Sequence, residues 1–462
     1  MNNPMSRRFA NEKIPKLILS LAAPAIAAQV INALYNVVDR MFIGRMPGIG
    51  TQALTGIGVG FPIIMIVSAF AALIGFGGAP LASIRMGEGN HKKAEALLGA
   101  SFLMLLIVSV LITLSFLAFK SPLLALFGAS PDTLPYADDY MGIYLIGTVT
   151  VLISLGLNQF IAAQGFAKTA MVTVCAGAAV NTILDPILIF GMDMGVKGAA
   201  LATVISQAIS AIWVLWFLTS KRTHLRLRVK HMRIDFNIAK SVLALGLSSF
   251  IMQSTESLVQ IVFNTSLAKY GGDLYVAAMG IMSSLMQIFT LLLQSFAQGA
   301  QPIVGYNFGS GDFARVKSTI MYCSFFCAIF GLSMWAVAIF MPQLPVMIFT
   351  NNADLIALTV SLMKIFFLGT CIYGVQLAFQ QMFIALGQAK VSIFIAILRK
   401  IILLIPLVYV LPAFIQPKTD AIIIAEPVAD IFAALACCAL FGFTVKSLLN
   451  KKTGINRKAA RN

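Results

Sequence analysis

Long apolar runs separated by short polar connections dominate this chain. Twelve runs are long enough to cross a bilayer as helices, which takes about 20 apolar residues each. They begin near Ile14, Thr51, Ala94, Pro135, Thr169, Lys197, Ile238, Val276, Lys317, Asp354, Lys390 and Ala421. The pattern predicts an all-α polytopic membrane protein with twelve transmembrane helices.

The two halves of the chain match each other at a nearly fixed offset. At an offset of 224 the identical pairs include Lys16 with Lys240, Gln29 with Gln253 and Gly56 with Gly280. At an offset of 222 they include Pro80 with Pro302, Gly87 with Gly309 and Gly165 with Gly387. Each copy holds six spans, so both enter the membrane in the same orientation, related by a pseudo-two-fold axis along the membrane normal. We expect two six-helix bundles, 1–220 and 237–450, with a basic linker, 221–236, and a basic tail, 451–462.

The first predicted span carries a polar stripe that ends in a carboxylate. Its members are three, four and three positions apart, on one face of a helix: Gln29, Asn32, Asn36 and Asp39. The seventh span repeats the stripe as Gln253, Glu256 and Gln260. An ionised Asp near the bilayer centre costs roughly 2.5–3.5 kcal/mol on insertion scales, so such residues usually face a cavity or a partner. We expect both stripes to line a central cavity and to contact substrate.

Polar residues of the fifth and sixth spans add to this picture. Asn181 and Asp185 are four positions apart on one helical face, and Pro186 follows at once. Thr203 shares a face of the sixth span with Gln207 and Ser210. We expect Asp39, Asp185, Asn181 and Thr203 to converge as a proton or cation site. Two carboxylates in one dry pocket disfavour each other's charge and bring protonation toward physiological pH. The alternative is that both acids serve only structural hydrogen bonds.

The C-terminal half has ionisable residues of its own. Glu256, in the middle of its span, is a candidate for binding a cationic substrate or for a second coupling site. Arg399, Glu426 and Asp430 form either a structural ion-pair network or part of a functional site. Further candidates for contact with substrate are Asn158, Tyr373 and Gln376.

Composition agrees with this class. Hydrophobic residues make up 59% of the chain and charged residues 11%, against about 25% charged in soluble domains. The net charge of +16 arises from basic residues at both termini and in every second connection, most densely from Lys221 to Arg233. The positive-inside rule places these segments in the cytoplasm. The same distribution argues against a nucleic-acid footprint, and the first run lacks a convincing signal-peptide cleavage site.

Several chemistries find no support in the sequence. The six cysteines show no metal-ligand spacing, and the three histidines lie in basic connections. The glycine-rich connections 87–90 and 309–312 lack the Gly-Lys-Ser/Thr of a P-loop, which argues against an ATPase. In each of them Asn90 or Asp312 is placed to cap the following helix. A membrane-embedded enzyme is disfavoured for the same lack of a nucleophile–base or metal set.

Three features together resemble the multidrug and toxic compound extrusion (MATE) family over essentially the whole chain. They are the duplicated six-span halves, the motif Asn181-x-x-x-Asp185-Pro186, and the first-span run Pro24…Gln29…Leu34-Tyr35-Asn36…Asp39…Phe42…Gly44. The similarity is to bacterial multidrug export members. It implies a V-shaped pair of bundles in the bacterial inner membrane, both termini cytoplasmic. It also implies an N-lobe coupling site of Asp39, Asp185, Asn181 and Thr203, accompanied by Tyr35.

The resemblance bears on the C-terminal half as well. Glu256 matches the seventh-span acid of members that have a C-lobe cation site. Those members also place an acid in the tenth span, whereas here Lys364 is the only charged residue between Leu355 and Leu386. This departure favours coupling through the N-terminal half.

The expected function is export of lipophilic organic cations in exchange for protons. One alternative is a sodium-coupled antiporter, with Asp39, Asn181, Asp185 and Thr203 as sodium ligands. Another is a flippase of the same superfamily for lipid-linked sugars or lipids. We expect no cofactor beyond the coupling ion, H⁺ or Na⁺. The expected partners are small organic cations and membrane lipids, without nucleic acid, and the expected state is a monomer.

Overall fold

The computed structural model describes residues 4–233 and 235–459, and within these ranges it is helical, without a strand. Two predicted segments extend beyond them. Position 234 of the linker and positions 460–462 of the basic tail lie outside the described residues. Positions 451–459 of the predicted tail continue the last helix.

The spans occur where the apolar runs predict them. In the first half they are α2 (Ile14–Gly44), α3 (Gly50–Gly87), α4 (His91–Leu126), α5 (Leu134–Ile146) with α6 (Thr148–Ala163), α7 (Ala167–Pro186) with the π-helical η1 (Ile187–Gly191), and α8 (Gly195–Thr219). In the second half they are α9 (Phe236–Gly271), α10 (Asp273–Ser310), α11 (Phe313–Phe340), α13 (Ala353–Phe366) with η3 (Phe367–Gly369) and α14 (Thr370–Ala385), α15 (Ala389–Ile397) with the π-helical η4 (Leu398–Leu404), α16 (Ile405–Val410) and η5 (Leu411–Ala413), and α17 (Lys418–Ala459). Short elements are α1 (Pro4–Asn11), η2 (Val229–His231) and α12 (Gln343–Met347).

Eleven helices among the described residues are long and apolar enough to cross a membrane. The number becomes 12 when α5 and α6, which are bent by 57° at Gly147, count as one span. The predicted all-α membrane fold with twelve spans is therefore confirmed. The bend was not predicted, because the apolar run continues through Gly147 without interruption.

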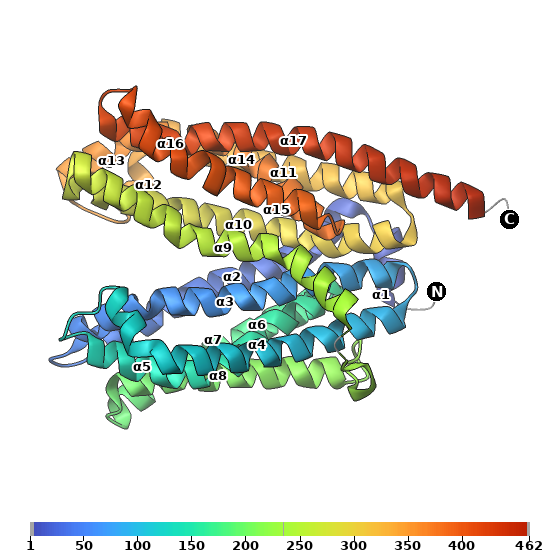
Figure 1. The fold of residues 1–462 in the computed structure, drawn as a ribbon, viewed down its shortest axis with the longest axis horizontal. Helices are drawn as coiled ribbons and strands as arrows, with labels where there is room; N and C mark the ends of the chain where they lie inside the picture. The colour runs from blue at the N-terminus through green and yellow to red at the C-terminus, as the bar shows by residue number, and fades with distance from the viewer. Residues whose placement is uncertain (1–3, 234, 460–462) are drawn as a thin grey trace. The chain divides into compact units, whose positions relative to one another are not determined.

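The chain forms two compact units. The N-terminal unit is Ala23–Phe250, and the C-terminal unit combines Met1–Ala22 with Ile251–Asn462. Within the C-terminal unit α14 packs against both α11 and α17, and the three run side by side (Figure 1). The division falls inside α2 and α9. The predicted halves, 1–220 and 237–450, describe the sequence repeat and stay a prediction.

Close backbone contacts explain why the units divide inside α2 and α9. A Cβ atom on Gly246 of α9 would overlap the backbone of α3, and one on Gly77 of α3 would overlap that of α9. In the other copy a Cβ on Gly299 of α10 would lie 2.7 Å from the Cα of Ala22 in α2. Lipid-embedded helices gain little from hydrophobic association, so small residues that permit close packing decide which helices pair. The first part of α9 therefore packs on α3, and the first part of α2 packs on α10.

The repeat is also visible in how the spans are interrupted. Gly147 separates α5 from α6, and Gly369, 222 positions later, is the last residue of η3 and directly precedes α14. Each glycine allows the last span of its own copy to approach: a Cβ on Gly147 would meet Val204 of α8, and one on Gly369 would lie 2.7 Å from the Cβ of Asp430 in α17. Both fifth spans of the repeat contain a π-helical segment, η1 and η4. The duplicated sequence thus reproduces the same helix breaks.

The predicted caps of the glycine-rich connections are present. The Asn90 side chain accepts a hydrogen bond from the backbone N–H of Lys93 at 3.1 Å, and Asp312 accepts one from that of Arg315 at 3.0 Å. The glycine before each cap has a positive φ, 73° at Gly89 and 83° at Gly311. Because few other residues adopt this conformation without strain, the glycines support the turn. These connections are structural turns, as their sequences indicate.

Part of the basic linker is fixed to the N-terminal unit by the Gln164 side chain at the end of α6. Its Oε1 accepts hydrogen bonds from the Thr223 hydroxyl at 2.8 Å, the His224 N–H at 2.9 Å and the Leu225 N–H at 2.8 Å. Burial, with a smaller effect of the neighbouring His91, lowers the pKa of His224. These hydrogen bonds therefore hold this segment of the linker against the end of α6.

Candidate functional site

Two carboxyl groups meet inside the N-terminal unit. Asp39 of α2 and Asp185 of α7 lie within hydrogen-bonding reach of each other. Asp185 is 0% exposed and Asp39 9%. The Asn181 amide donates a hydrogen bond to Oδ1 of Asp185 at 3.3 Å. We call these three residues the acid site.

The acid site lacks partners for some of its oxygens. Oδ1 of Asp39, Oδ2 of Asp185 and Oδ1 of Asn181 are buried without a hydrogen-bond partner. An uncompensated buried carboxylate is costly, and the usual resolution is a proton or a cation. The site can therefore take up positive charge in either form.

Local structure positions Asp185 for this role. The four-residue spacing places Asn181 and Asp185 one above the other on the same face of α7. The proline that follows Asp185 ends the regular α-helix, and the π-helical η1 comes next. π-helical turns inside spans are frequent at functional sites.

Aromatic side chains surround the acid site. Tyr35 is close to both carboxyl groups, and its hydroxyl lies within hydrogen-bonding reach of Gln207. Tyr140 of α5 is close to Asp39, and its hydroxyl lies within hydrogen-bonding reach of the Thr203 side chain. The predicted residue Thr203 thus joins the site through Tyr140. This places Tyr35 and Thr203, as well as the three residues of the acid site, in one region of the N-terminal unit.

Sequence reasoning missed three contributors here: Tyr140, Tyr144 and Ser154. Tyr140 stacks on Tyr144 with ring centroids 6.3 Å apart, and both are buried. The Ser154 hydroxyl donates to Oε1 of Gln207 at 2.6 Å, which fixes the amide beside Tyr35. The available signal was the four-residue spacing of Tyr140 and Tyr144 on one helical face. It is weak, because buried aromatic residues most often serve packing.

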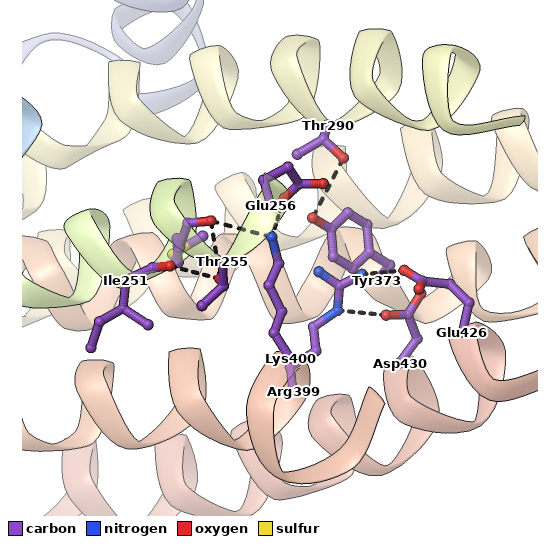
Figure 2. Close-up of polar contacts among 10 residues, drawn as sticks. Ile251, Thr255, Glu256, Thr290, Tyr373, Arg399, Lys400, Glu426 and Asp430 are labelled. Atoms are coloured by element: carbon purple, nitrogen blue, oxygen red, sulfur yellow. Dashed lines mark hydrogen bonds and ion pairs between the residues drawn. The ribbon is translucent and has the colours of Figure 1, made fainter. Parts of the chain in front are cut away.

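A second group of ionisable side chains lies in the C-terminal unit. We call it the charge cluster: Glu256 of α9, Arg399 and Lys400 of η4, and Glu426 and Asp430 of α17. Arg399 donates from Nε to Oδ1 of Asp430 at 2.6 Å and from Nη2 to Oε1 of Glu426 at 2.9 Å. Lys400 forms an ion pair with Glu256 and donates to the backbone carbonyl of Met252 at 3.2 Å. Figure 2 shows these contacts.

The predicted network of Arg399 with Glu426 and Asp430 is present in the structure. The Arg399 guanidinium also lies over the Tyr373 ring, 4.5 Å from its centroid, and the Tyr373 hydroxyl is 3.5 Å from that of Thr290. With two carboxylates and an aromatic face as partners, Arg399 is held on several sides. The pairing of Glu256 with Lys400 was not predicted.

The remaining candidates for contact with substrate are dispersed. The exposed Asn36 side chain donates to the Asn32 carbonyl on its own helix, at 2.7 Å. The Asn158 amide bonds the Ala170 carbonyl at 3.1 Å and so joins α6 to α7. Gln253 and Gln260 are half-buried on α9, and Gln376 is buried with an unpartnered Oε1. A role in substrate contact stays a prediction for all of them.

The acid site also bears on ion choice. Within residues 4–233 and 235–459 no group of three or more His, Cys, Asp or Glu side chains is placed to hold a metal ion. Carboxylate, amide and hydroxyl oxygens, which hard cations prefer, are nevertheless available at Asp39, Asp185, Asn181 and Thr203. The residues therefore fit sodium in chemical type as well as they fit a proton.

Up to twelve apolar spans among the described residues, arranged as a repeat with ionisable groups inside the membrane, define a multi-pass membrane transport protein. The family model MatE matches residues 24–187 and 248–410, one match in each half. The chain therefore belongs to the MATE family and is a transporter rather than an enzyme.

Individual relatives agree with this assignment. The chain is 27% identical over 447 residues to the multidrug export protein MepA of Staphylococcus haemolyticus, covering 96% of each chain. It is 26% identical over 430 residues to the protein of that name from Staphylococcus saprophyticus, covering 92% of this chain and 94% of the relative.

Solved structures share the fold at low sequence identity. A MATE crystal structure in the bent conformation superposes with a TM-score of 0.91 at 21% identity, over 98% of this chain and 99% of the other. An outward-facing multidrug resistance MATE transporter of the MOP superfamily gives a TM-score of 0.88 at 21% identity, over 97% and 99%. These matches establish the twelve-helix MATE fold for this chain.

Proposed function

We propose that this chain exports small lipophilic organic cations from a bacterial cell in exchange for protons that bind at the acid site. The observation that carries the proposal is the buried pair Asp39 and Asp185, each with a carboxylate oxygen that lacks a partner. Export of multiple drugs is supported by the MepA relatives, whose coverage of 96% extends over both halves. The protein acts as a monomer in the inner membrane, with both termini in the cytoplasm.

Competition for negative charge couples the two movements. Protonation from the outside neutralises the acid site, so a bound cation loses its counter-charge and leaves. Release of the proton to the cytoplasm restores the charge and favours the next cation. A ligand shifts a conformational equilibrium only by its differential affinity for the two states, and the charge at Asp39 and Asp185 supplies that difference.

The test is ethidium efflux from proteoliposomes that contain the full-length protein. A pH gradient alone and a sodium gradient alone are each applied to wild type and to Asp39→Asn. We expect the pH gradient to drive efflux in wild type and not in Asp39→Asn, and we expect the purified variant to bind dye more weakly than wild type because one of the two carboxylate charges is missing. Asp193→Asn is the matched control, because Asp193 is exposed and has a left-handed φ of 52° that Asn tolerates.

Two other results would redirect the proposal. If only sodium drives efflux, the same oxygens serve as a sodium site and proton coupling is wrong. If neither gradient moves any organic cation, the proposed drug export fails and a lipid-linked substrate becomes the next candidate.

A further inference from the structure

The charge cluster carries a surplus negative charge at its exposed edge. Arg399, Lys400, Glu426 and Asp430 contribute two positive and two negative charges, which balance. Glu256 adds one negative charge, so the five residues have a formal charge of −1. The Glu256 side chain is 65% exposed, whereas that of Lys400 is 9% exposed. The unbalanced charge is therefore on the side chain that an incoming ligand reaches first.

Adjacent residues of η4 point to different partners. Arg399 is directed at the acids of α17 and lies over Tyr373, while Lys400 extends to α9 (Figure 2). Arginine holds carboxylates with a rigid planar fork, whereas lysine is a compact charge on a flexible stem. Of the two cations, Lys400 is the one whose carboxylate partner can be exchanged.

Lys400 has a second acceptor that remains when its carboxylate leaves. Its ammonium donates to the Met252 carbonyl at 3.2 Å as well as pairing with Glu256. The exposed Glu256 side chain can therefore turn toward a ligand while Lys400 stays in place. The buried cluster is left with a formal charge of zero. Oδ2 of Asp430 is buried without a hydrogen-bond partner and is a further acceptor for positive charge in this cluster.

We propose that Glu256 offers the cationic substrate a second carboxylate in addition to the acid site, and that Lys400 competes with the substrate for it, so that this ion pair limits cation affinity and permits release. The inference rests on the proposed export of organic cations. An organic monovalent cation binds Glu256 only in the fraction of molecules where Lys400 has released it. Apparent affinity falls by that fraction, which is about tenfold if one molecule in ten is free.

Equilibrium dialysis of labelled tetraphenylphosphonium with the full-length purified protein tests the proposal. This probe has no hydrogen-bonding group, so its affinity reports charge and apolar contacts. We expect Lys400→Met to bind it about tenfold more tightly than wild type. Lys364→Met is the matched control, because Lys364 is an exposed lysine of α13 in the same unit. This control is expected to leave the affinity unchanged.

A double-variant comparison identifies the partner. Glu256→Gln is expected to weaken binding, and Lys400→Met is expected to have a clearly smaller effect when Glu256→Gln is present than in wild type. Lys400→Arg is a second variant in case Lys400→Met does not fold. Because arginine can hold Glu256 by two parallel hydrogen bonds, it is expected to weaken cation binding relative to wild type.

The dialysis results test the role of Lys400 independently of the proposed export. Unchanged or weaker binding in a folded Lys400→Met would overturn it, as would an equal gain in the presence of Glu256→Gln. Stronger binding in Lys400→Arg than in wild type would do the same. Dialysis uses no gradient, so a failure of gradient-driven efflux with the expected affinities rejects the proposed export alone. Normal efflux without the expected affinities rejects the role of Lys400 alone.

Discussion

The Asn181 amide donates to one carboxylate oxygen of Asp185, one helical turn further along α7, and leaves the other oxygen without a partner. The spacing allows the first contact, since residues four apart lie on one face of a helix. One amide cannot neutralise a buried carboxylate. Asp39 lies within hydrogen-bonding reach of Asp185, so the two acids share one buried site.

Asp185→Asn should separate transport from stability. The neutral side chain keeps the shape of the acid site and removes a buried charge, so thermal unfolding is expected at the same or a higher temperature than in wild type. Gradient-driven ethidium efflux is expected to fall to the level of empty liposomes, because the proposed function assigns proton exchange to this carboxyl group. A clear drop in unfolding temperature together with lost efflux would instead assign Asp185 a structural role.

Much of the fold could be predicted because it depends on local sequence patterns. Runs of about 20 apolar residues require helices in lipid, and the caps at Asn90 and Asp312 depend on side chains next to the helix start. Asp39 and Asp185 could be predicted to lie in one site because acids inside membrane spans usually face a shared cavity or a partner. The bend at Gly147 could not, because it depends on the approach of α8, which the apolar pattern does not encode.

The pairing of Glu256 with Lys400 was out of reach for a related reason. The two residues are 144 positions apart, and the helix that carries Lys400 is π-helical at that point. A π-helical segment changes the angle between successive side chains, so the 3.6-residue periodicity no longer tells which face Arg399 and Lys400 occupy. The partners of Arg399 and Lys400 therefore depend on tertiary contacts, which local sequence patterns do not reveal.

Gly246→Ala should destabilise the protein through backbone contact alone. A Cβ at this position would overlap the Leu73 carbonyl of α3, so α9 must move away from α3. We expect a loss of about 1–3 kcal/mol, the usual cost of overpacking. Gly280→Ala is the control: a Cβ there meets nothing within 4 Å, and alanine is the better helix former. Thermal unfolding in detergent compares the two, and equal stability of both variants would contradict the close contact.

Gln164→Ala should release the linker from the N-terminal unit. The change removes the acceptor of the Leu225 N–H, and an unsatisfied buried donor costs about 1–3 kcal/mol. The linker must open locally before a protease can cleave it. The population of this open state rises about tenfold for each 1.4 kcal/mol of lost stability. Trypsin is expected to cut after Arg222 or Arg226 correspondingly faster than in wild type. Gln388→Ala, at the equivalent turn of the second copy, is expected to leave this rate unchanged, and an equal rise there would argue against a specific clamp.

Arg399→Met should be among the most destabilising changes in the C-terminal unit. It removes the partner of Glu426 and Asp430 at once, and breaking a buried ion pair on one side costs about 3–5 kcal/mol. Adding Asp430→Asn is expected to restore part of the loss, because one uncompensated charge disappears with it. Lys390→Met, at an exposed lysine of α15, is the control and is expected to be neutral. Thermal unfolding of the four proteins distinguishes the outcomes: if Asp430→Asn adds to the damage instead of relieving it, the cluster is held by specific hydrogen bonds rather than by charge balance.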